Sequence, residues 1–280
     1  MDIVDLLAKL LVTCGRNRAD LCYNFMGTEN RMAEDCFFLN LGYWQAAEDY
    51  PSAAEALVDL LAEAAKIGNE DEVLDAGCGF GDQDVRLMKT RRPKRILAIN
   101  ITDVQIDDAH RRNTLPGIEY RKCSATAVDE ADGSFDAVIS LEAAFHFDTR
   151  ETFMREAFRL LRPGGRLGVV DLLPLESGGR LLTGGMRGAI ERWAYQVPTA
   201  NVYGVSRYRE ILETTGFKDV QIRSIREQVF PGFLKHLQRM LEDSAAKKRT
   251  HPLIRLAMKY AGDPFAASDY IVVSSVKEAT

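Results

Sequence analysis

The stretch Val73-Leu74-Asp75-Ala76-Gly77-Cys78-Gly79-Phe80-Gly81 decides the fold. An apolar run ends in an acid, glycine then recurs at every second position, and Asp82-Gln83-Asp84 opens a segment typical of a helix. Glycines let the backbone approach a ligand closely, and a helix N-terminus offers unpaired N–H groups to an anion. The spacing G-x-G-x-G differs from the G-x-G-x-x-G of dinucleotide-binding loops. It favours an adenosine cofactor with an amino-acid end in place of a pyrophosphate.

The bulk composition is that of a globular protein. The chain has 280 residues, of which 46% are hydrophobic and 28% charged, and this length fits one large α/β domain with insertions or two small domains. A net charge of −5 argues against a nucleic-acid partner. Five cysteines without a C-x-x-C pair favour a reduced, cytoplasmic protein. We find no apolar run long enough for a membrane span and no basic start typical of a secretory signal.

Strand-like and helix-like segments alternate along most of the chain. We expect strands at 72–75, 95–99, 118–120, 135–140, 166–171, 220–229 and 269–275, and helices at 3–12, 52–66, 82–90, 103–113, 150–161, 206–215 and 231–261. This alternation predicts a parallel sheet with helices on both faces. We expect residues 1–50 to form a helical cap over the cofactor and residues 51–280 the main domain. Residues 172–204 and 231–267 interrupt the pattern, and we interpret them as insertions that form a lid over the substrate.

Three motifs together resemble the class I S-adenosylmethionine-dependent methyltransferases, in particular the branch that methylates hydroxyls of natural-product sugars and polyketides. They are the glycine stretch, Gly133-Ser134-Phe135-Asp136-Ala137-Val138-Ile139, and Glu156-Ala157-Phe158-Arg159-Leu160-Leu161-Arg162-Pro163-Gly164-Gly165. The resemblance covers roughly residues 20 to 276. It implies a Rossmann-like sheet of strand order 3-2-1-4-5-7-6 with strand 7 antiparallel, and S-adenosylmethionine as cofactor.

The resemblance also implies which residues bind the cofactor. Asp75 and the glycines correspond to the methionine end, and Asn100 stands where the family often has an acid for the ribose. Ser124 and Ala125 stand where the family often has an Asp beside the adenine. The expected set is Tyr23, Asp75, Gly77, Cys78, Gly79, Gly81, Gln83, Asn100, Ile101, Thr102, Gln105, Ser124, Ala125, Leu141 and Glu142.

His146 is the best candidate for a general base. It follows the fourth strand, at the edge where ligands bind in open α/β sheets, and an ordinary imidazole pKa near 6.5 suits proton removal from a hydroxyl. Asp171, at the end of the fifth strand, is a candidate to orient the imidazole. The alternatives are that His146 only lines the pocket or bonds to the backbone, and that Asp171 is a cap or turn carboxylate.

Aromatic residues in the cap and the insertions are candidates for the acceptor pocket, with ordinary core packing as the alternative for each. They are Tyr43, Trp44, Phe145, Trp193 and Tyr203. The spacing of the histidines indicates no metal site.

The sequence therefore predicts a methyltransferase that acts on a hydroxyl of a small molecule, without a metal and with a homodimer as a further expectation. Four readings of the function stay open. The leading one is O-methylation. The others are N- or C-methylation of an amine, lipid or isoprenoid-like acceptor without a base, a nicotinamide-dependent oxidoreductase, and a cofactor-binding subunit without catalysis.

Overall fold

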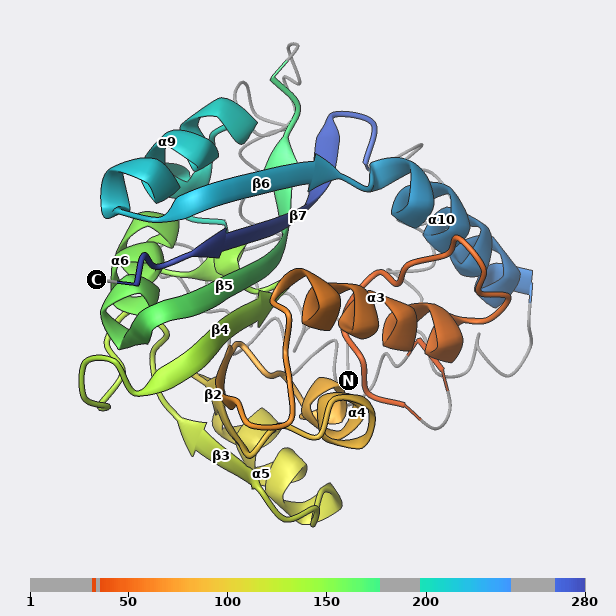
Figure 1. Ribbon diagram of the computed structural model, residues 1–280. Coiled ribbons are helices and arrows are strands. Elements are labelled where there is room, and N and C mark those ends of the chain that lie inside the picture. The colour runs from red at the N-terminus through yellow and green to blue at the C-terminus, as the bar shows by residue number, and fades with distance from the viewer. Residues whose placement is uncertain (1–31, 34–35, 177–196, 243–264, 280) are drawn as a thin grey trace, which may run out of the picture.

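One sheet of seven strands forms the centre of the molecule (Figure 1). The computed structural model describes residues 32–33, 36–176, 197–242 and 265–279. The strand order is β3-β2-β1-β4-β5-β7-β6, and β7 runs antiparallel to both of its neighbours. The predicted fold class is therefore confirmed. The strands are β1 (Glu72–Ala76), β2 (Arg95–Asn100), β3 (Ile118–Lys122), β4 (Phe135–Leu141), β5 (Leu161–Pro174), β6 (Lys218–Ser224) and β7 (Ser268–Val276).

Both faces of the sheet are covered, because successive residues of its central strands point to opposite sides and are apolar on both. Val73 and Ile96 belong to one buried cluster, whereas their neighbours Leu74 and Leu97 belong to the other. The first cluster includes side chains of α3 (Tyr50–Ala64), α4 (Asp82–Thr90), α5 (Asp103–Arg112) and α10 (Arg226–Glu242); the second includes side chains of α6 (Arg150–Leu160) and α9 (Val205–Thr215). Two 3-10 helices, η1 (Ala144–His146) and η2 (Thr199–Asn201), lie in connections.

Local signals explain where several helices begin and end. The Asp49 side chain accepts from the Ser52 N–H at 2.8 Å and caps α3, and a proline stands in the first turn. Gly216, with φ +114°, ends α9 in the left-handed conformation. These boundaries agree with the sequence-based expectations to within about two residues.

Two expected elements are wrong in their bounds. The strand expected over residues 220–229 ends at Ser224, and α10 begins at Arg226 and contains Pro231. The strand expected over 166–171 extends from Leu161 to Pro174, so the first residues of the expected insertion at 172–204 continue β5. These residues of β5 pair with β7, as does the rest of the strand from Arg166 onward. The expected helix over 3–12, Tyr23, Trp193 and most of both insertions lie outside the described residues.

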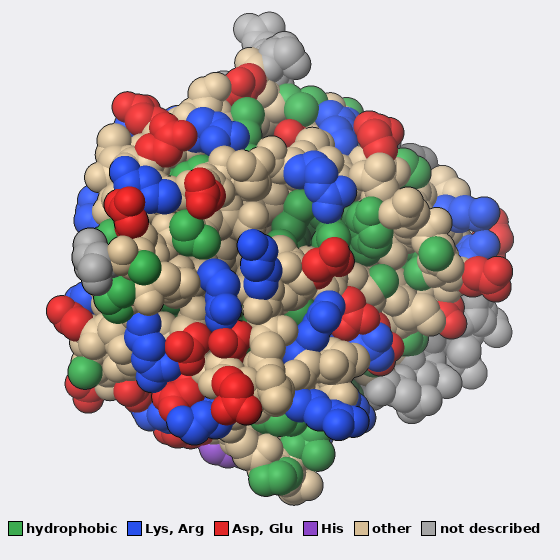
Figure 2. All heavy atoms as spheres, viewed as in Figure 1, with side chains coloured by type: hydrophobic (Ala, Val, Ile, Leu, Met, Phe, Trp, Pro, Cys, Tyr) green, Lys and Arg blue, Asp and Glu red, His purple; other side chains and the backbone are tan. Residues whose placement is uncertain are grey.

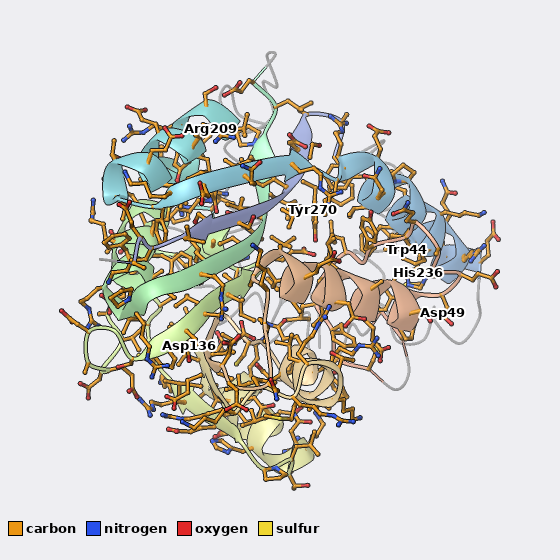
Figure 3. The ribbon with its side chains drawn as sticks, viewed as in Figure 1. Trp44, Asp49, Asp136, Arg209, His236 and Tyr270 are labelled. Atoms are coloured by element: carbon orange, nitrogen blue, oxygen red, sulfur yellow. The ribbon has the colours of Figure 1, made fainter. Side chains whose placement is uncertain are left out.

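The irregular segment 36–49 packs beside α3 and α10. The Tyr43 N–H donates to the Ala53 carbonyl and the Trp44 N–H to the Gln228 carbonyl, both at 2.8 Å. The Trp44 ring lies 5.7 Å from the His236 ring, centroid to centroid, at one end of the molecule (Figure 3). This segment therefore makes contacts with both helices.

The face shown in Figure 2 carries Lys and Arg side chains interspersed with Asp and Glu. Within the described part of the chain, no helix has the length and apolar character needed to cross a membrane.

Candidate active site

The glycine loop between β1 and α4 is closely packed. A Cβ on Gly77, whose φ is +95°, would lie 2.3 Å from the Ala143 Cβ, and one on Gly81, whose φ is +82°, would lie 2.5 Å from the Tyr120 hydroxyl oxygen. Side chains at these two positions would collide with the packed structure and strain the backbone. The contact with Ala143 also shows that the loop after β4, residues 143–149, lies directly against the glycine loop.

Two buried carboxyl groups stand behind the glycine loop. Asp75 and Asp84 are both 0% exposed, and the Gln83 side-chain amide donates to Asp75 Oδ2. Burial raises the pKa of Asp75 to about 6, and burial together with the Asp75 charge raises the pKa of Asp84 well above its usual range. The mutual repulsion of two neighbouring ionised carboxylates favours the protonated form of Asp84 beside an ionised Asp75.

The end of β2 presents polar groups suited to a ribose. The Asn100 side chain donates from Nδ2 to Gln105 Oε1 at 2.7 Å and accepts the Ile101 N–H at 2.8 Å. Asn100 therefore fixes the Gln105 amide, and among the described residues Gln105 Nε2 has no hydrogen-bond partner. Thr102 stands at the N-cap of α5, yet its hydroxyl makes no capping bond and is likewise without a described partner. The adjacent Ile101 is 50% exposed and, with Val104 at 42%, is one of two exposed large apolar side chains among the described residues.

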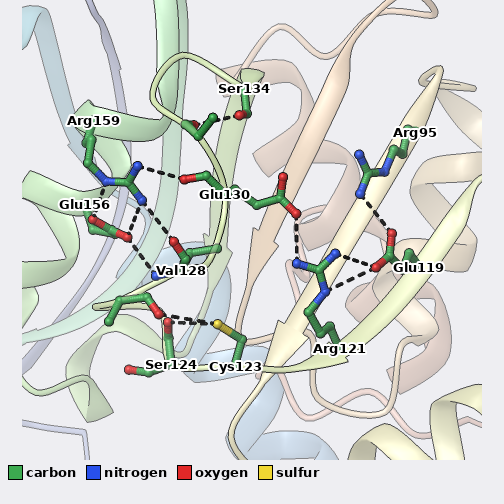
Figure 4. Close-up of polar contacts among 12 residues, drawn as sticks. Arg95, Glu119, Arg121, Cys123, Ser124, Val128, Glu130, Ser134, Glu156 and Arg159 are labelled. Carbon is green, nitrogen blue, oxygen red and sulfur yellow. Dashed lines mark hydrogen bonds and ion pairs between the residues drawn. The ribbon is translucent and has the colours of Figure 1, made fainter.

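Ser124 and Ala125, expected at the adenine end, follow β3. The Cys123 N–H donates to the Asn100 carbonyl at 2.9 Å, which keeps this segment beside the end of β2. Ser124 is exposed and Ala125 is buried. The Arg159 guanidinium holds the following residues through bonds to the carbonyls of Val128 and Glu130 at 3.0 and 2.8 Å (Figure 4).

These groups fit an adenosine cofactor with an amino-acid end. Asp75 Oδ1 has no partner among the described residues and can accept from an ammonium group. The unpaired Gln105 amide and Thr102 hydroxyl can bond to ribose hydroxyls, and the exposed Ile101 offers an apolar surface to a base. Cys78 is buried, and burial raises the pKa of its thiol well above the usual range, which agrees with a small packing residue.

Glu142, one residue beyond β4, has a φ of +51° and connects three elements. Its Oε1 accepts from the Leu41 N–H at 2.6 Å and from the Tyr270 hydroxyl, and its own N–H donates to the Val170 carbonyl at 2.8 Å. Burial raises the pKa of this carboxyl to about 8. The preceding Leu141 is buried. Glu142 thus holds the segment 36–49 against β7, and its expected contact with the cofactor stays a prediction.

His146 ends the short helix η1 on the loop that packs against the glycine loop. Its ring is half-buried and lies 3.9 Å from the Phe145 ring, centroid to centroid. The backbone N–H of His146 donates to the Ala143 carbonyl at 3.0 Å. The imidazole therefore belongs to the same sheet edge as the groups suited to the cofactor.

Asp171 is fully buried near the end of β5 and engages Arg150. The Arg150 Nε lies 2.8 Å from Asp171 Oδ2, and the carboxylate also accepts the backbone N–H groups of Leu172 and Phe145. Burial raises the pKa of Asp171 even though Arg150 opposes this shift. Its position therefore links β5 to the backbone of the His146 loop.

The structure places the expected acceptor residues in different environments. Trp44 packs on α10, where Gly232 leaves room for its ring, and its Nε1 donates to the Leu41 carbonyl at 2.8 Å. The Tyr43 hydroxyl donates to Gln45 Oε1 at 2.6 Å. Tyr203 is half-buried, with the Arg150 guanidinium 5.3 Å from its ring centroid. Of the expected acceptor residues that the structure describes, Phe145 packs on His146. Trp193 lies outside the described residues.

Sequence reasoning missed three residues of this region: Asp84, Arg150 and Asn201. A signal existed for Asp84, which shares the buried stripe of α4 with Leu87 three residues later. No signal existed for Arg150, because an arginine at the start of a helix is ordinarily solvated. Nor did the sequence distinguish Asn201 from a loop asparagine.

Within the described ranges, no group of three or more His, Cys, Asp or Glu side chains is arranged to hold a metal ion.

Comparison with known proteins identifies the family of the chain. Residues 74–169 match the family described as Methyltransferase domain. The chain is 32% identical over 251 residues to the erythromycin 3''-O-methyltransferase of Saccharopolyspora erythraea, covering 87% of this chain and 82% of that protein. It is 27% identical over 254 residues to O-methyltransferase resE of Aspergillus sclerotiorum, covering 84% and 90%.

Among solved structures, the fold is similar to the geranyl diphosphate C-methyltransferase of Streptomyces coelicolor A3(2), in complex with Mg2+, geranyl diphosphate and S-adenosyl-L-homocysteine. The TM-score is 0.70 at 14% identity, covering 94% of this chain and 98% of that one. At this identity the similarity concerns the fold alone.

Proposed function

This chain belongs to the class I S-adenosylmethionine-dependent methyltransferases that act on small molecules, and from that premise we propose that it methylates a hydroxyl of a natural product with His146 as general base. The carrying observation is the direct packing of the loop that bears His146 against the glycine loop, through Ala143 and Gly77. A base on this loop stands beside the methionine end of the cofactor site. The 32% identity to erythromycin 3''-O-methyltransferase supports the choice of acceptor.

S-adenosylmethionine, when bound, supplies a methyl group on a sulfonium, which is already activated for displacement. The protein has to align the acceptor oxygen and remove its proton. A hydroxyl is a poor nucleophile until a base takes that proton, and general-base catalysis contributes about 10²–10⁴-fold. We assign the proton to His146, whose half-buried ring is held by Phe145 on one side.

The proposed cofactor contacts follow from the unpaired polar atoms. Asp75 holds the amino group of the methionine end, while Gln105 and Thr102 bond to the ribose. Asn100 acts through Gln105, since its own amide is already engaged. Ile101 and the Ser124-Ala125 pair flank the adenine.

The test uses S-adenosylmethionine and 3''-O-demethylerythromycin as the hydroxyl probe, with phosphoethanolamine and geranyl diphosphate as amine and carbon probes. We expect the hydroxyl probe alone to gain one methyl group, detected by mass spectrometry and located by NMR. Methylation of the amine or the carbon probe instead would contradict the proposal and favour a reaction without a base. Binding of NADH instead of S-adenosylhomocysteine in calorimetry would contradict it as well.

The cytoplasmic location, the homodimer and the lack of a nucleic-acid partner remain predictions from the sequence. The division into a cap over residues 1–50 and a domain over 51–280 is likewise our proposal, and so are the lids expected within 172–204 and 231–267, apart from residues 172–174, which continue β5, and residues 231–242, which belong to α10.

A further inference from the structure

We propose that Asn201 and the buried pair Arg150–Asp171 form a positioning network for the loop that carries His146. The inference rests on the proposed function, in which that imidazole removes a proton. These three residues come from η2, α6 and β5, and all of them are buried. None of the three belongs to the residues expected to touch the cofactor, and Asp171 alone among them was expected to orient the imidazole.

Asn201 holds the backbone on both sides of His146. Its Nδ2 donates to the Phe145 carbonyl at 3.1 Å and to the Phe147 carbonyl at 2.8 Å. Its Oδ1 accepts the Arg150 N–H at 2.9 Å. One amide therefore uses both of its donors on the residues directly before and after the histidine, and its acceptor on the first residue of α6.

The ion pair holds the same loop from the side of the sheet. Asp171 accepts the Phe145 N–H in addition to Arg150 Nε. The Arg150 guanidinium also donates to the Leu172 carbonyl at 2.6 Å and to the Asn201 carbonyl. Phe145 is consequently fixed at its N–H by β5 and at its carbonyl by η2.

The arrangement suits positioning more than simple stabilisation. A fully buried charge pair is costly to desolvate, and well-packed apolar residues of similar volume often serve stability equally well. Here the pair and the amide satisfy each other and end on the two residues that flank one imidazole. Buried and fully bonded networks of this kind restrict a site to one geometry.

The consequence is that His146 keeps its orientation before the acceptor binds. A displacement of a catalytic group by about 1 Å can lower turnover about 10²-fold. We therefore expect the network to affect turnover and the environment of the imidazole, and to leave cofactor affinity unchanged.

The experiment compares Asn201→Ala with Lys277→Met in the full chain saturated with S-adenosylhomocysteine. Lys277 is a matched control, because its Nζ donates two hydrogen bonds of 2.8 Å to the carbonyls of Phe158 and Leu161, near the opposite end of β5. The readout is the NMR signal of ¹³Cε1-labelled histidine, with the His146 signal assigned from the variant His146→Gln.

For Asn201→Ala we expect the His146 signal to shift and broaden and its titration midpoint to move, with S-adenosylhomocysteine affinity unchanged. Lys277→Met should keep the wild-type signal. An unchanged His146 signal in a folded Asn201→Ala protein would overturn the inference. Because this readout needs no acceptor, it separates the inference from the proposed function, which is tested by turnover.

A second variant covers the case in which Asn201→Ala does not fold. The double variant Arg150→Met with Asp171→Leu replaces the ion pair by apolar side chains and leaves no buried charge. We expect it to fold and to alter the His146 signal in the same direction. A folded double variant with a wild-type His146 signal would contradict the role of the pair.

Discussion

Replacement of Glu142 by Gln should remove a specific part of the pH dependence of stability. The carboxyl accepts the Leu41 N–H and the Tyr270 hydroxyl, and an amide oxygen can accept the same two bonds. The variant therefore reproduces the protonated side chain at every pH. Burial raises the pKa of Glu142 from its ordinary 4.5 to about 8, so the folded protein keeps a proton that the unfolded chain releases.

This difference in bound protons decides whether the free energy of unfolding rises or falls with pH. The stabilising contribution of Glu142 is complete below pH 4.5 and is lost as the pH rises toward about 8. Within this window one proton changes the free energy of unfolding by at most about 1.4 kcal/mol per pH unit. The stability of the Gln variant relative to wild type should therefore increase between these limits and then level off.

The assay is urea unfolding followed by tryptophan fluorescence at several pH values from 5 to 9, with equal m-values as a check on the two-state treatment. Glu156→Gln is the matched control. Hydrogen bonds from Arg159 lower the pKa of Glu156, so its contribution is lost only as the pH falls below its ordinary 4.5, and the difference between wild type and this variant should stay constant from pH 5 to 9. A difference between wild type and Glu142→Gln that stays constant over the whole range would refute the reasoning.

Three further changes test the cofactor site, each by calorimetry with S-adenosylhomocysteine. Asp84→Asn should bind almost as wild type because its amide is a neutral donor like a protonated acid, whereas Asp84→Leu should weaken binding about tenfold, since an unpaired buried polar group costs about 1–3 kcal/mol; equal affinities of the two variants would contradict the protonated form of Asp84. Gly77→Ala should abolish binding and lower the Tm by several degrees, because the added Cβ would lie 2.3 Å from a neighbouring Cβ. Gly79→Ala should have a milder effect, because its added Cβ would lie 3.4 Å from its nearest neighbour. A larger loss of binding in Gly79→Ala than in Gly77→Ala would contradict the packing argument. Gln105→Leu should weaken binding about tenfold through the ribose, and unchanged affinity would exclude that contact.

The sheet and the glycine loop could be predicted from the sequence because their signals are local. Apolar strands, the acid before the glycines and the proline and glycines that follow α6 each depend on a few neighbouring residues. The boundary between β6 and α10 could not, because the β-branched residues Val220, Ile222 and Val229 suit a strand. The helix starts at Arg226 through its tertiary contacts, in which the Gln228 carbonyl accepts the Trp44 N–H from a distant segment.

Near the proposed base, one residue could be predicted from the sequence and others could not. His146 could be selected because its place after the fourth strand is set by chain order. The residues of the network around Asp171 could not be selected, since Arg150 is 21 positions from Asp171 and Asn201 is 30, and nothing in their own neighbourhoods marks them as buried. Burial of a charged side chain is decided by which elements meet, which a local pattern does not contain.

The proposed role of His146 can be measured most directly by comparing wild type with His146→Ala in methyl transfer to the hydroxyl probe, with S-adenosylhomocysteine affinity measured in parallel. We predict that turnover falls by about two to four orders of magnitude while the cofactor affinity stays the same. Turnover close to wild type in the variant would contradict the assignment of His146 as the base.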